Sequence, residues 1–284
     1  MHLLSWNIQW TRGMDGRVDA ARITRTIRLL GDFDVVCLQE VAVNFPGLPG
    51  SRGEDQVAGL AAGLPGYTPV FAAATDVPDG RGGRSLFGNV IFSRLPVEQV
   101  WRHLLPWQAE PDTPSMQRVL VEVVVATDCG PVRVMTTHLE YYSQRQRELQ
   151  IDAIRCLHRE ACMMARRKIL PGESGGPFAV FPRPAQAVLC GDMNFAAHTP
   201  EYDRIRAPFR GDAVPDFYDA WALLHPGIAH TPTVGIHPVD FVDRPECFDF
   251  IFITDGLKKQ LKAWDTDSTT DASDHQPVWI ELVC

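Results

Sequence analysis

Short apolar runs, each followed by a polar or charged residue, recur along the whole sequence. The runs are rich in Val and Ile, and several are apolar at every position, as in the Val-Val-Cys-Leu run at residues 35–38. Strands without polar alternation must be covered on both faces, which is the situation in layered α/β folds. We therefore expect buried strands at residues 2–6, 35–39, 90–93, 119–126, 132–137, 187–190, 250–254 and 278–283.

Helical patterns lie between these runs. Residues 19–30 carry apolar side chains at helical spacing and are followed by Gly31, a common helix stop. A second helix is expected to begin at Ser143, which forms a capping-box pattern with Gln146, and to end near residues 166–168. A shorter helix is expected within residues 54–64, and the Gly- and Pro-rich residues 171–184 are expected to form a surface loop.

Length and charge restrict the function. The chain has 284 residues, of which 45% are hydrophobic, so it can bury one sizeable core, and we expect a single domain over residues 1–284. The formal net charge is -8 and the sequence has no polybasic tail, which argues against a protein that grips long duplexes by charge alone. A nuclease is not excluded, because bound metal ions would add positive charge.

Cysteine usage and hydropathy suggest a compartment. The seven cysteines form no Cys-x-x-Cys pair and several lie in apolar runs, which favours buried free thiols in a reducing environment. An apparent strand follows Met1 directly, so no signal peptide is expected. No apolar stretch approaches the ~18 residues that are needed to span a membrane. We therefore expect a cytoplasmic protein without a membrane partner.

Polar residues at the ends of the apolar runs are the candidates for chemistry. Each one alone fits a turn former, a solvated carboxylate or a core histidine, although an aspartate inside Phe-Asp-Phe-Ile-Phe is costly to bury without a partner. Together, carboxylates and Asn oxygens suit Mg²⁺ or Mn²⁺, and a His beside a carboxylate suits acid–base work. The candidates are Asn7, Glu40, His138, Asp192, Asn194, Asp249, Asp274 and His275.

Seven short motifs carry a resemblance to a known family. They are Ser5-Trp6-Asn7, Leu38-Gln39-Glu40-Val41, Gly88-Asn89-Val90-Ile91-Phe92-Ser93, Thr137-His138-Leu139, Gly191-Asp192-Met193-Asn194, Asp249-Phe250-Ile251-Phe252 and Ser273-Asp274-His275-Gln276-Pro277. In this order the chain resembles the endonuclease/exonuclease/phosphatase superfamily. That family includes pancreatic-type DNases, abasic-site endonucleases, neutral sphingomyelinases and inositol-polyphosphate phosphatases. The resemblance implies a four-layered α/β sandwich, in which two face-to-face mixed sheets are flanked by helices.

The resemblance also implies a metal site. Glu40 would be the principal ligand of Mg²⁺ or Mn²⁺, helped by Asn7 and Asp274. Gln9 stands where some abasic-site enzymes carry an aspartate, so the sequence does not support a second metal near Asn7.

Roles in catalysis follow from the same resemblance. Asp192 would orient or deprotonate the attacking water, and Asn194 would hold the phosphate or Asp192. His275, oriented by Asp249, would contact the scissile phosphate, and His138 would be a second histidine beside it. DNase-like members pair this second histidine with an upstream Glu, for which the sequence shows no counterpart.

Substrate choice is expected to depend on the loops. Asn89 is a candidate for the pocket wall, and Arg118 and Arg145 are candidates for bidentate phosphate contacts. Arginines of this kind are more often exposed to solvent or paired with one of the surplus acidic residues of the chain.

The leading interpretation is a divalent-metal-dependent phosphodiester hydrolase, a nuclease acting on a small or single-stranded substrate. One alternative is a phosphomonoesterase or a lipid or inositol-phosphate phosphodiesterase on the same scaffold. A non-enzyme alternative is a catalytically dead phosphate-binding module, which is disfavoured because the acidic and histidine residues all remain. We expect His275→Ala to remove most turnover with little loss of stability. The sequence does not indicate an oligomeric state.

Overall fold

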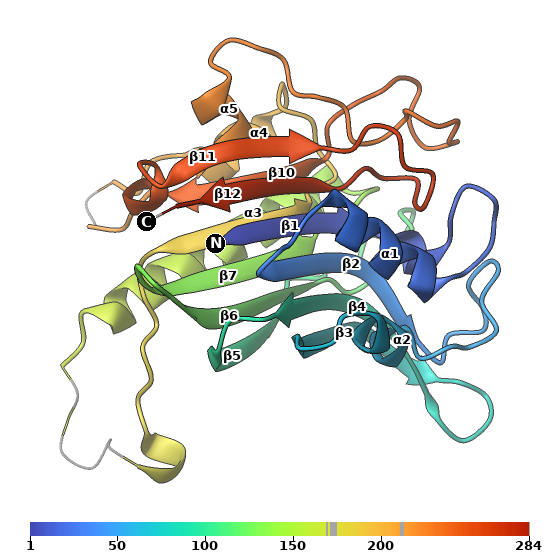
Figure 1. The fold of residues 1–284 in the computed structure, drawn as a ribbon, viewed down its shortest axis with the longest axis horizontal. Coiled ribbons are helices and arrows are strands. Elements are labelled where there is room, and N and C mark those ends of the chain that lie inside the picture. Colours follow the sequence, from blue (N-terminus) through green and yellow to red (C-terminus); the bar gives the residue numbers. More distant parts are fainter. Residues whose placement is uncertain (169, 171–174, 211–212, 284) are drawn as a thin grey trace.

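Two six-stranded sheets pack face to face in the computed structural model, which describes residues 1–168, 170, 175–210 and 213–283 (Figure 1). The strands are β1 (His2–Asn7), β2 (Val35–Val43), β3 (Thr68–Pro78), β4 (Arg84–Ser93), β5 (Val97–Leu104), β6 (Val119–Thr127), β7 (Gly130–His138), β8 (Ala187–Asp192), β9 (Phe217–Asp219), β10 (Asp249–Thr254), β11 (Leu261–Thr266) and β12 (Val278–Leu282). The helices are α1 (Ala20–Leu30), α2 (Gln56–Gly63), α3 (Gln144–Ala165), α4 (Pro200–Arg206) and α5 (Ala220–Leu224), with 3-10 turns η1 (Gln9–Thr11), η2 (Gly176–Phe178) and η3 (Asp255–Leu257).

The two sheets have matching topologies. The first sheet has the order β11-β12-β1-β2-β4-β3, and the second has the order β5-β6-β7-β8-β10-β9. Each sheet contains one parallel pair near its centre, β1 with β2 and β7 with β8, while the other neighbours are antiparallel. The first and last strands, β1 and β12, lie side by side in the first sheet (Figure 1). Residues from both ends of the chain therefore reach the same edge of the sandwich.

Three apolar clusters fill the spaces between four layers. Leu3 and Ile91 of the first sheet pack with Val121 and Ile251 of the second, while α1 and α2 cover the outer face of the first sheet and α3 and α4 that of the second. Each buried Leu or Ile contributes roughly 1.5–3 kcal/mol relative to exposure. This is the predicted four-layered α/β sandwich. In the part of the chain that the structure describes, no helix is long and apolar enough to cross a membrane.

Local signals placed the main helices correctly. The Asp19 carboxylate accepts hydrogen bonds from the backbone N–H groups of Ala21 and Arg22 and so caps α1. Ser143 caps α3 by accepting from the backbone N–H of Gln146 at 3.0 Å. The Gln146 side chain does not close the capping box, because it donates to the Gln108 carbonyl instead.

Some expectations need correction. All eight predicted strands are present, but several are longer than predicted, and β3, β5, β9 and β11 were not predicted. Residues 171–174 of the expected loop lie outside the described residues, and the described remainder contains only the short turn η2. Cys37, Cys162, Cys190 and Cys247 are buried free thiols, whereas Cys156 is an exposed free thiol and Cys129 is disulfide-bonded.

Candidate active site

The sheet topology brings the candidate residues to one end of the sandwich. Asn7, His138 and Asp192 are the last residues of β1, β7 and β8. β7 and β8 are parallel, so their carboxyl ends meet at one edge of the second sheet, and Asn7 reaches this edge from the first sheet, where it donates to Asp192. β10 is antiparallel to β8, so its first residue, Asp249, is the direct partner of Asp192. β12 is antiparallel to β1, so His275, which precedes β12, reaches the same edge. This edge is where open α/β sheets commonly bind ligands.

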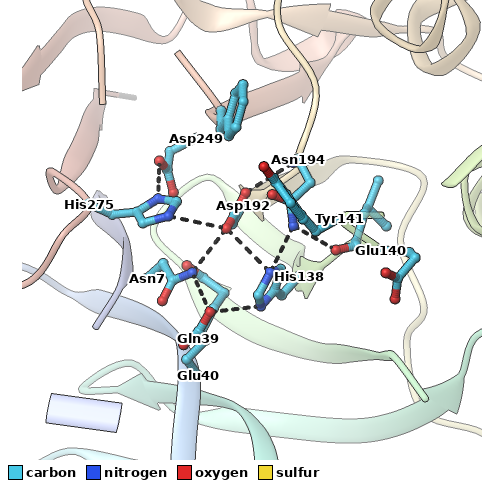
Figure 2. Close-up of polar contacts among 12 residues, drawn as sticks. Asn7, Gln39, Glu40, His138, Glu140, Tyr141, Asp192, Asn194, Asp249 and His275 are labelled. Carbon is cyan, nitrogen blue, oxygen red and sulfur yellow. Dashed lines mark hydrogen bonds and ion pairs between the residues drawn. The ribbon is translucent and has the colours of Figure 1, made fainter. Parts of the chain in front are cut away.

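A cavity of about 560 Å³ opens over these residues. Its volume lies within the ordinary range for small-molecule sites, roughly 300–1,000 Å³. Among the sequence-predicted residues, those that line it are Glu40, Arg118, His138, Asp192, Asn194, Asp274 and His275. Asn7 lies directly beneath, 1% exposed, and reaches the cavity through its contacts with Glu40 and Asp192 (Figure 2).

Asp192 occupies the centre of the site (Figure 2). Its Oδ2 accepts a hydrogen bond from Asn7 Nδ2 at 2.9 Å and lies 3.3 Å from His138 Nε2 and 3.6 Å from His275 Nε2. Its Oδ1 accepts from the backbone N–H of Asn194 at 3.0 Å. Burial, together with the nearby charge of Asp249, raises the pKa of Asp192 to about 6, although His275 opposes the rise. Asp192 is therefore a carboxylate poised to hold or release a proton near neutral pH.

Glu40 occupies an irregular position in β2. The pairing of β2 with β4 shifts register between Leu38 and Val41, and Glu40 has a left-handed φ of 58°. This bulge turns the side chain toward the cavity, where 18% of it stays exposed and its Oε1 accepts from Asn7 Nδ2 at 3.1 Å. Burial and the neighbouring carboxylate of Asp274 raise the pKa of Glu40 to about 7.

His275 is held by a buried carboxylate. His275 Nδ1 lies 2.9 Å from Asp249 Oδ2, and the Asp249 side chain is fully buried. Burial alone would lower the pKa of His275, but the charges of Asp249 and Asp192 raise it well above its ordinary value. His275 is thus a cation whose Nε2–H can be donated into the cavity.

His138 has the opposite character. The amide nitrogen of Asn194 donates one hydrogen to the Leu139 carbonyl at 2.8 Å and the other to His138 Nε2 at 2.9 Å. His138 Nε2 therefore accepts, and the ring proton resides on Nδ1, which faces Glu40 Oε1 at 3.7 Å. Burial and the positive charges of Arg118 and His275 keep the pKa of His138 well below its usual value. The site thus combines one charged and one neutral histidine.

Two groups of side chains could hold a cation. Asp192, Asp249 and His275 have ligand atoms within 4.8 Å of one another. However, Asp249 Oδ2 is already used by His275 and Thr233, and an imidazolium does not coordinate a metal. Glu40 and Asp274 fit better, because both face the cavity and their mutual repulsion raises the pKa of Glu40. Their oxygen donors suit Mg²⁺ or Mn²⁺, so the residues present fit the implied metal.

Three predicted substrate contacts lie in different environments. Arg118 lines the cavity, and its Nε donates to Glu140 Oε2 at 3.2 Å within a buried pair. Asn89 does not line this cavity, because it faces the second sheet and donates to the Val119 carbonyl at 2.9 Å. Arg145 is exposed on α3 and does not line the cavity either. The buried face of α3 passes through Gln146, and Arg145 therefore points elsewhere.

Thr233 and Glu140 are contributors that the sequence did not reveal. Thr233 is fully buried, accepts from the backbone N–H groups of Phe248 and Asp249, and donates to Asp249 Oδ2 at 2.6 Å. Its hydroxyl therefore orients the carboxylate that orients His275. Glu140, the fully buried partner of Arg118, directly follows the Thr137-His138-Leu139 motif. The position of Glu140 next to a motif was a signal in the sequence that could have revealed it. No such signal pointed to Thr233.

Replacing Glu40 with glutamine is expected to stabilise the metal-free protein at pH 8. The pKa of Glu40 is about 7 in the folded state, above the ordinary 4.5, so its contribution to stability is present below pH 4.5 and lost as the pH rises through 7. The expected gain is on the order of 1–3 kcal/mol at pH 8 and smaller at pH 5. Thermal unfolding in EDTA at both pH values would measure it. A loss of stability at pH 8 would contradict this description of Glu40.

Two mixed sheets with this cluster of carboxylates, amides and histidines at one edge define a phosphoester hydrolase of the α/β-sandwich class. The chain belongs to the Endonuclease/Exonuclease/phosphatase family, whose sequence model matches residues 4–275. The search of curated proteins gave no match.

Solved structures share the fold. An endonuclease/exonuclease/phosphatase from Beutenbergia cavernae is 26% identical with a TM-score of 0.71, and the match covers 100% of this chain and 72% of that one. The mannosyl-6-phosphatase Bt3783 of Bacteroides thetaiotaomicron is 18% identical with a TM-score of 0.68 and 100% coverage of both chains. TDP2 of D. rerio, in complex with a single-strand DNA product, is 18% identical with a TM-score of 0.62, covering 99% and 97%.

Proposed function

We propose that this chain is a divalent-metal-dependent phosphodiester hydrolase acting on small or single-stranded substrates, a nuclease in the broad sense. One observation carries the proposal: the Asp249–His275 pair and the carboxylates of Glu40 and Asp274 converge on Asp192 in a single cavity. The same cavity thus holds side chains that can transfer a proton and side chains that can bind a cation, and phosphoester hydrolysis needs both. The likeness to TDP2 with its single-strand DNA product supports this substrate class.

Each residue of the site has a separate role in the proposed reaction. Glu40, Asp274 and Asn7 would hold Mg²⁺ or Mn²⁺, which supplies charge neutralisation at the phosphate when it is bound. Asp192, with a pKa of about 6, accepts a proton from the attacking water. His275 donates its Nε2–H to a phosphate oxygen, while Asp249 keeps it charged and oriented. Asn194 fixes both Asp192 and His138 through its backbone and side-chain amides.

A phosphomonoesterase is the second candidate. The mannosyl-6-phosphatase of Bacteroides thetaiotaomicron shares the fold over both complete chains, which favours this alternative. A monoester dianion carries more negative charge than a diester, and it would meet Glu40, Asp192 and Asp274 in the same cavity. Arg118 offers less compensation because it is paired with Glu140. The charge balance therefore favours the diester.

Hydrolysis of a small panel tests the proposal. The panel contains an aryl phosphodiester, a short single-stranded DNA, a duplex of the same sequence, an aryl phosphomonoester and an inositol phosphate, each with Mg²⁺, Mn²⁺ or EDTA. We expect metal-dependent cleavage of the diester and the single strand, and at most weak cleavage of the others. Faster cleavage of the monoester would favour the phosphatase. A folded protein that binds Mn²⁺ and cleaves none of them would refute hydrolysis of these esters.

A further inference from the structure

Two groups of aromatic side chains stand above the polar floor of the active-site cavity. The first group, Trp10, Phe45 and Phe87, comes from segments that belong to or follow strands of the first sheet. The rings of Phe45 and Phe87 meet edge to face, with centroids 6.4 Å apart. Trp10 is fixed by its Nε1–H, which donates to the Pro49 carbonyl at 2.9 Å. These rings are held in place before any ligand arrives.

The second aromatic group is Tyr141, Tyr142 and Phe241, on the side of the second sheet. Tyr141 meets Tyr142 and Phe241 edge to face, with centroids 4.8 and 6.1 Å away. The Tyr141 hydroxyl donates to the Phe241 carbonyl at 2.5 Å, and Tyr141 lies beside Asn194 (Figure 2). The Phe241 ring stacks on His275 at 6.1 Å with an interplanar angle of 17°. The second group therefore packs against His275, the histidine to which the proposed function assigns the phosphate.

The charges around the cavity limit how many phosphates it accepts. Of the described residues that line it, the cationic ones are Arg118 and His275, besides the neutral His138. Arg118 is paired with Glu140, and Glu40, Asp192 and Asp274 add negative charge. One metal and His275 can neutralise one phosphate group. A second phosphate, or a negatively charged alcohol, would face ring carbon rather than a cation.

We propose that this cavity holds one phosphate of the phosphoester substrate and, beside it, a flat, uncharged ring, which lies between the two aromatic groups. Ring faces and edges attract one another beyond simple apolar burial, so such walls distinguish a planar ring from an aliphatic one. The ring could be a nucleobase or an aryl group, since both have the same stacking chemistry. This inference rests on the proposed function, because it assigns the alcohol part of the substrate of that reaction.

Binding of phosphinates tests the inference without turnover. Monoanionic methylphosphinates have no ester bond to cleave, and the second substituent can be methyl, cyclohexyl, phenyl or an adenine joined by an ethyl linker. Calorimetry with Mn²⁺ would give their dissociation constants. We expect phenyl or adenine to bind roughly 3- to 10-fold more tightly than cyclohexyl. The tighter of the two identifies an aryl ester or a nucleotide as the natural source of the ring.

A variant in the first aromatic group localises the effect. Phe45→Leu should remove most of the preference for the planar ring over cyclohexyl, while dimethylphosphinate binds as before. Phe178→Leu is the matched control, because Phe178 is 77% exposed on η2 and does not line this cavity.

The possible outcomes distinguish a failure of the ring site from a failure of the proposed hydrolysis. Equal binding of phenyl, adenine and cyclohexyl compounds would overturn the inference even if the enzyme hydrolyses phosphodiesters. An unchanged ring preference in Phe45→Leu would also overturn the assignment to these walls. Ring-selective binding by a protein that hydrolyses nothing in the panel would instead uphold the ring site and refute the proposed reaction.

Discussion

Replacing Asp192 with asparagine is expected to lower kcat on a phosphodiester by about 10²- to 10⁴-fold, the usual contribution of a general base. Asparagine keeps the shape, and its single amide oxygen can still accept either from Asn7 or from the backbone N–H of Asn194, but it cannot take a proton from water. Burial raises the pKa of Asp192 to about 6, so its loss as a charge should not destabilise the fold. Steady-state kinetics and thermal unfolding together would show a loss of rate without a loss of stability.

Asp219→Asn is a matched control for this variant. Asp219 is a buried aspartate of the same sheet, outside the cavity, where it accepts from the Tyr202 hydroxyl at 2.6 Å and caps α5. Its replacement should affect stability and leave kcat within about threefold, since the reacting groups are untouched. If Asp192→Asn retained normal kcat, Asp192 would not be the base. Another group, such as Glu40, would then take that role.

The sequence predicted the buried part of the sandwich because burial on both faces produces uninterrupted apolar runs. Three of the four strands it missed, β3, β5 and β11, have exposed positions. β5 is an edge strand whose residues are exposed or half-buried, and β3 is also an edge strand, with exposed residues at both ends. Edge strands carry polar residues that avoid unwanted pairing, and those residues remove the apolar signal. The alternation of apolar and polar residues that should reveal such strands is therefore weak.

Residues at strand ends were predictable for a related reason. Asn7, His138 and Asp192 stand where a buried run ends, so their positions follow from the strands themselves. The conformation of Glu40 could not be predicted, because a left-handed φ of 58° is unusual for a non-glycine residue and depends on the register shift with β4. Thr233 lies in an irregular segment. Its role depends on a contact with Asp249, 16 residues away, which no local pattern records.

The substrate contacts were the least predictable part of the site. Arg118 reaches the cavity, yet its charge is taken up by Glu140, which only the folded structure pairs with it. Arg145 differs from the buried Gln146 by one position on α3, and a single step around a helix is about 100°, enough to turn a side chain away from the site. The cavity walls are aromatic, and Phe45 and Phe241 come from loops that are nearly 200 residues apart.

Replacing His275 with alanine is expected to lower kcat by about 10²- to 10⁴-fold and, unlike the expectation from sequence, to reduce stability as well. The rate falls because the only charged imidazole among the described cavity residues is removed from the phosphate. Stability falls because Asp249 is fully buried and would lose its cationic partner, while its Oδ1 already has no hydrogen-bond partner. Leaving a buried charge unpaired costs roughly 3–5 kcal/mol.

The double variant Asp249→Asn/His275→Ala separates the two effects. Removing the orphaned charge should restore part of the lost stability, because a neutral amide can keep the hydrogen bond from Thr233 at that place. Activity should stay as low as in His275→Ala, since the imidazole is still missing. His2→Ala, a half-exposed histidine at the other end of the first sheet, is the control for both measurements. A double variant that regained normal kcat would show that His275 acts only by neutralising Asp249, whereas restored stability with low kcat would place His275 in the chemistry.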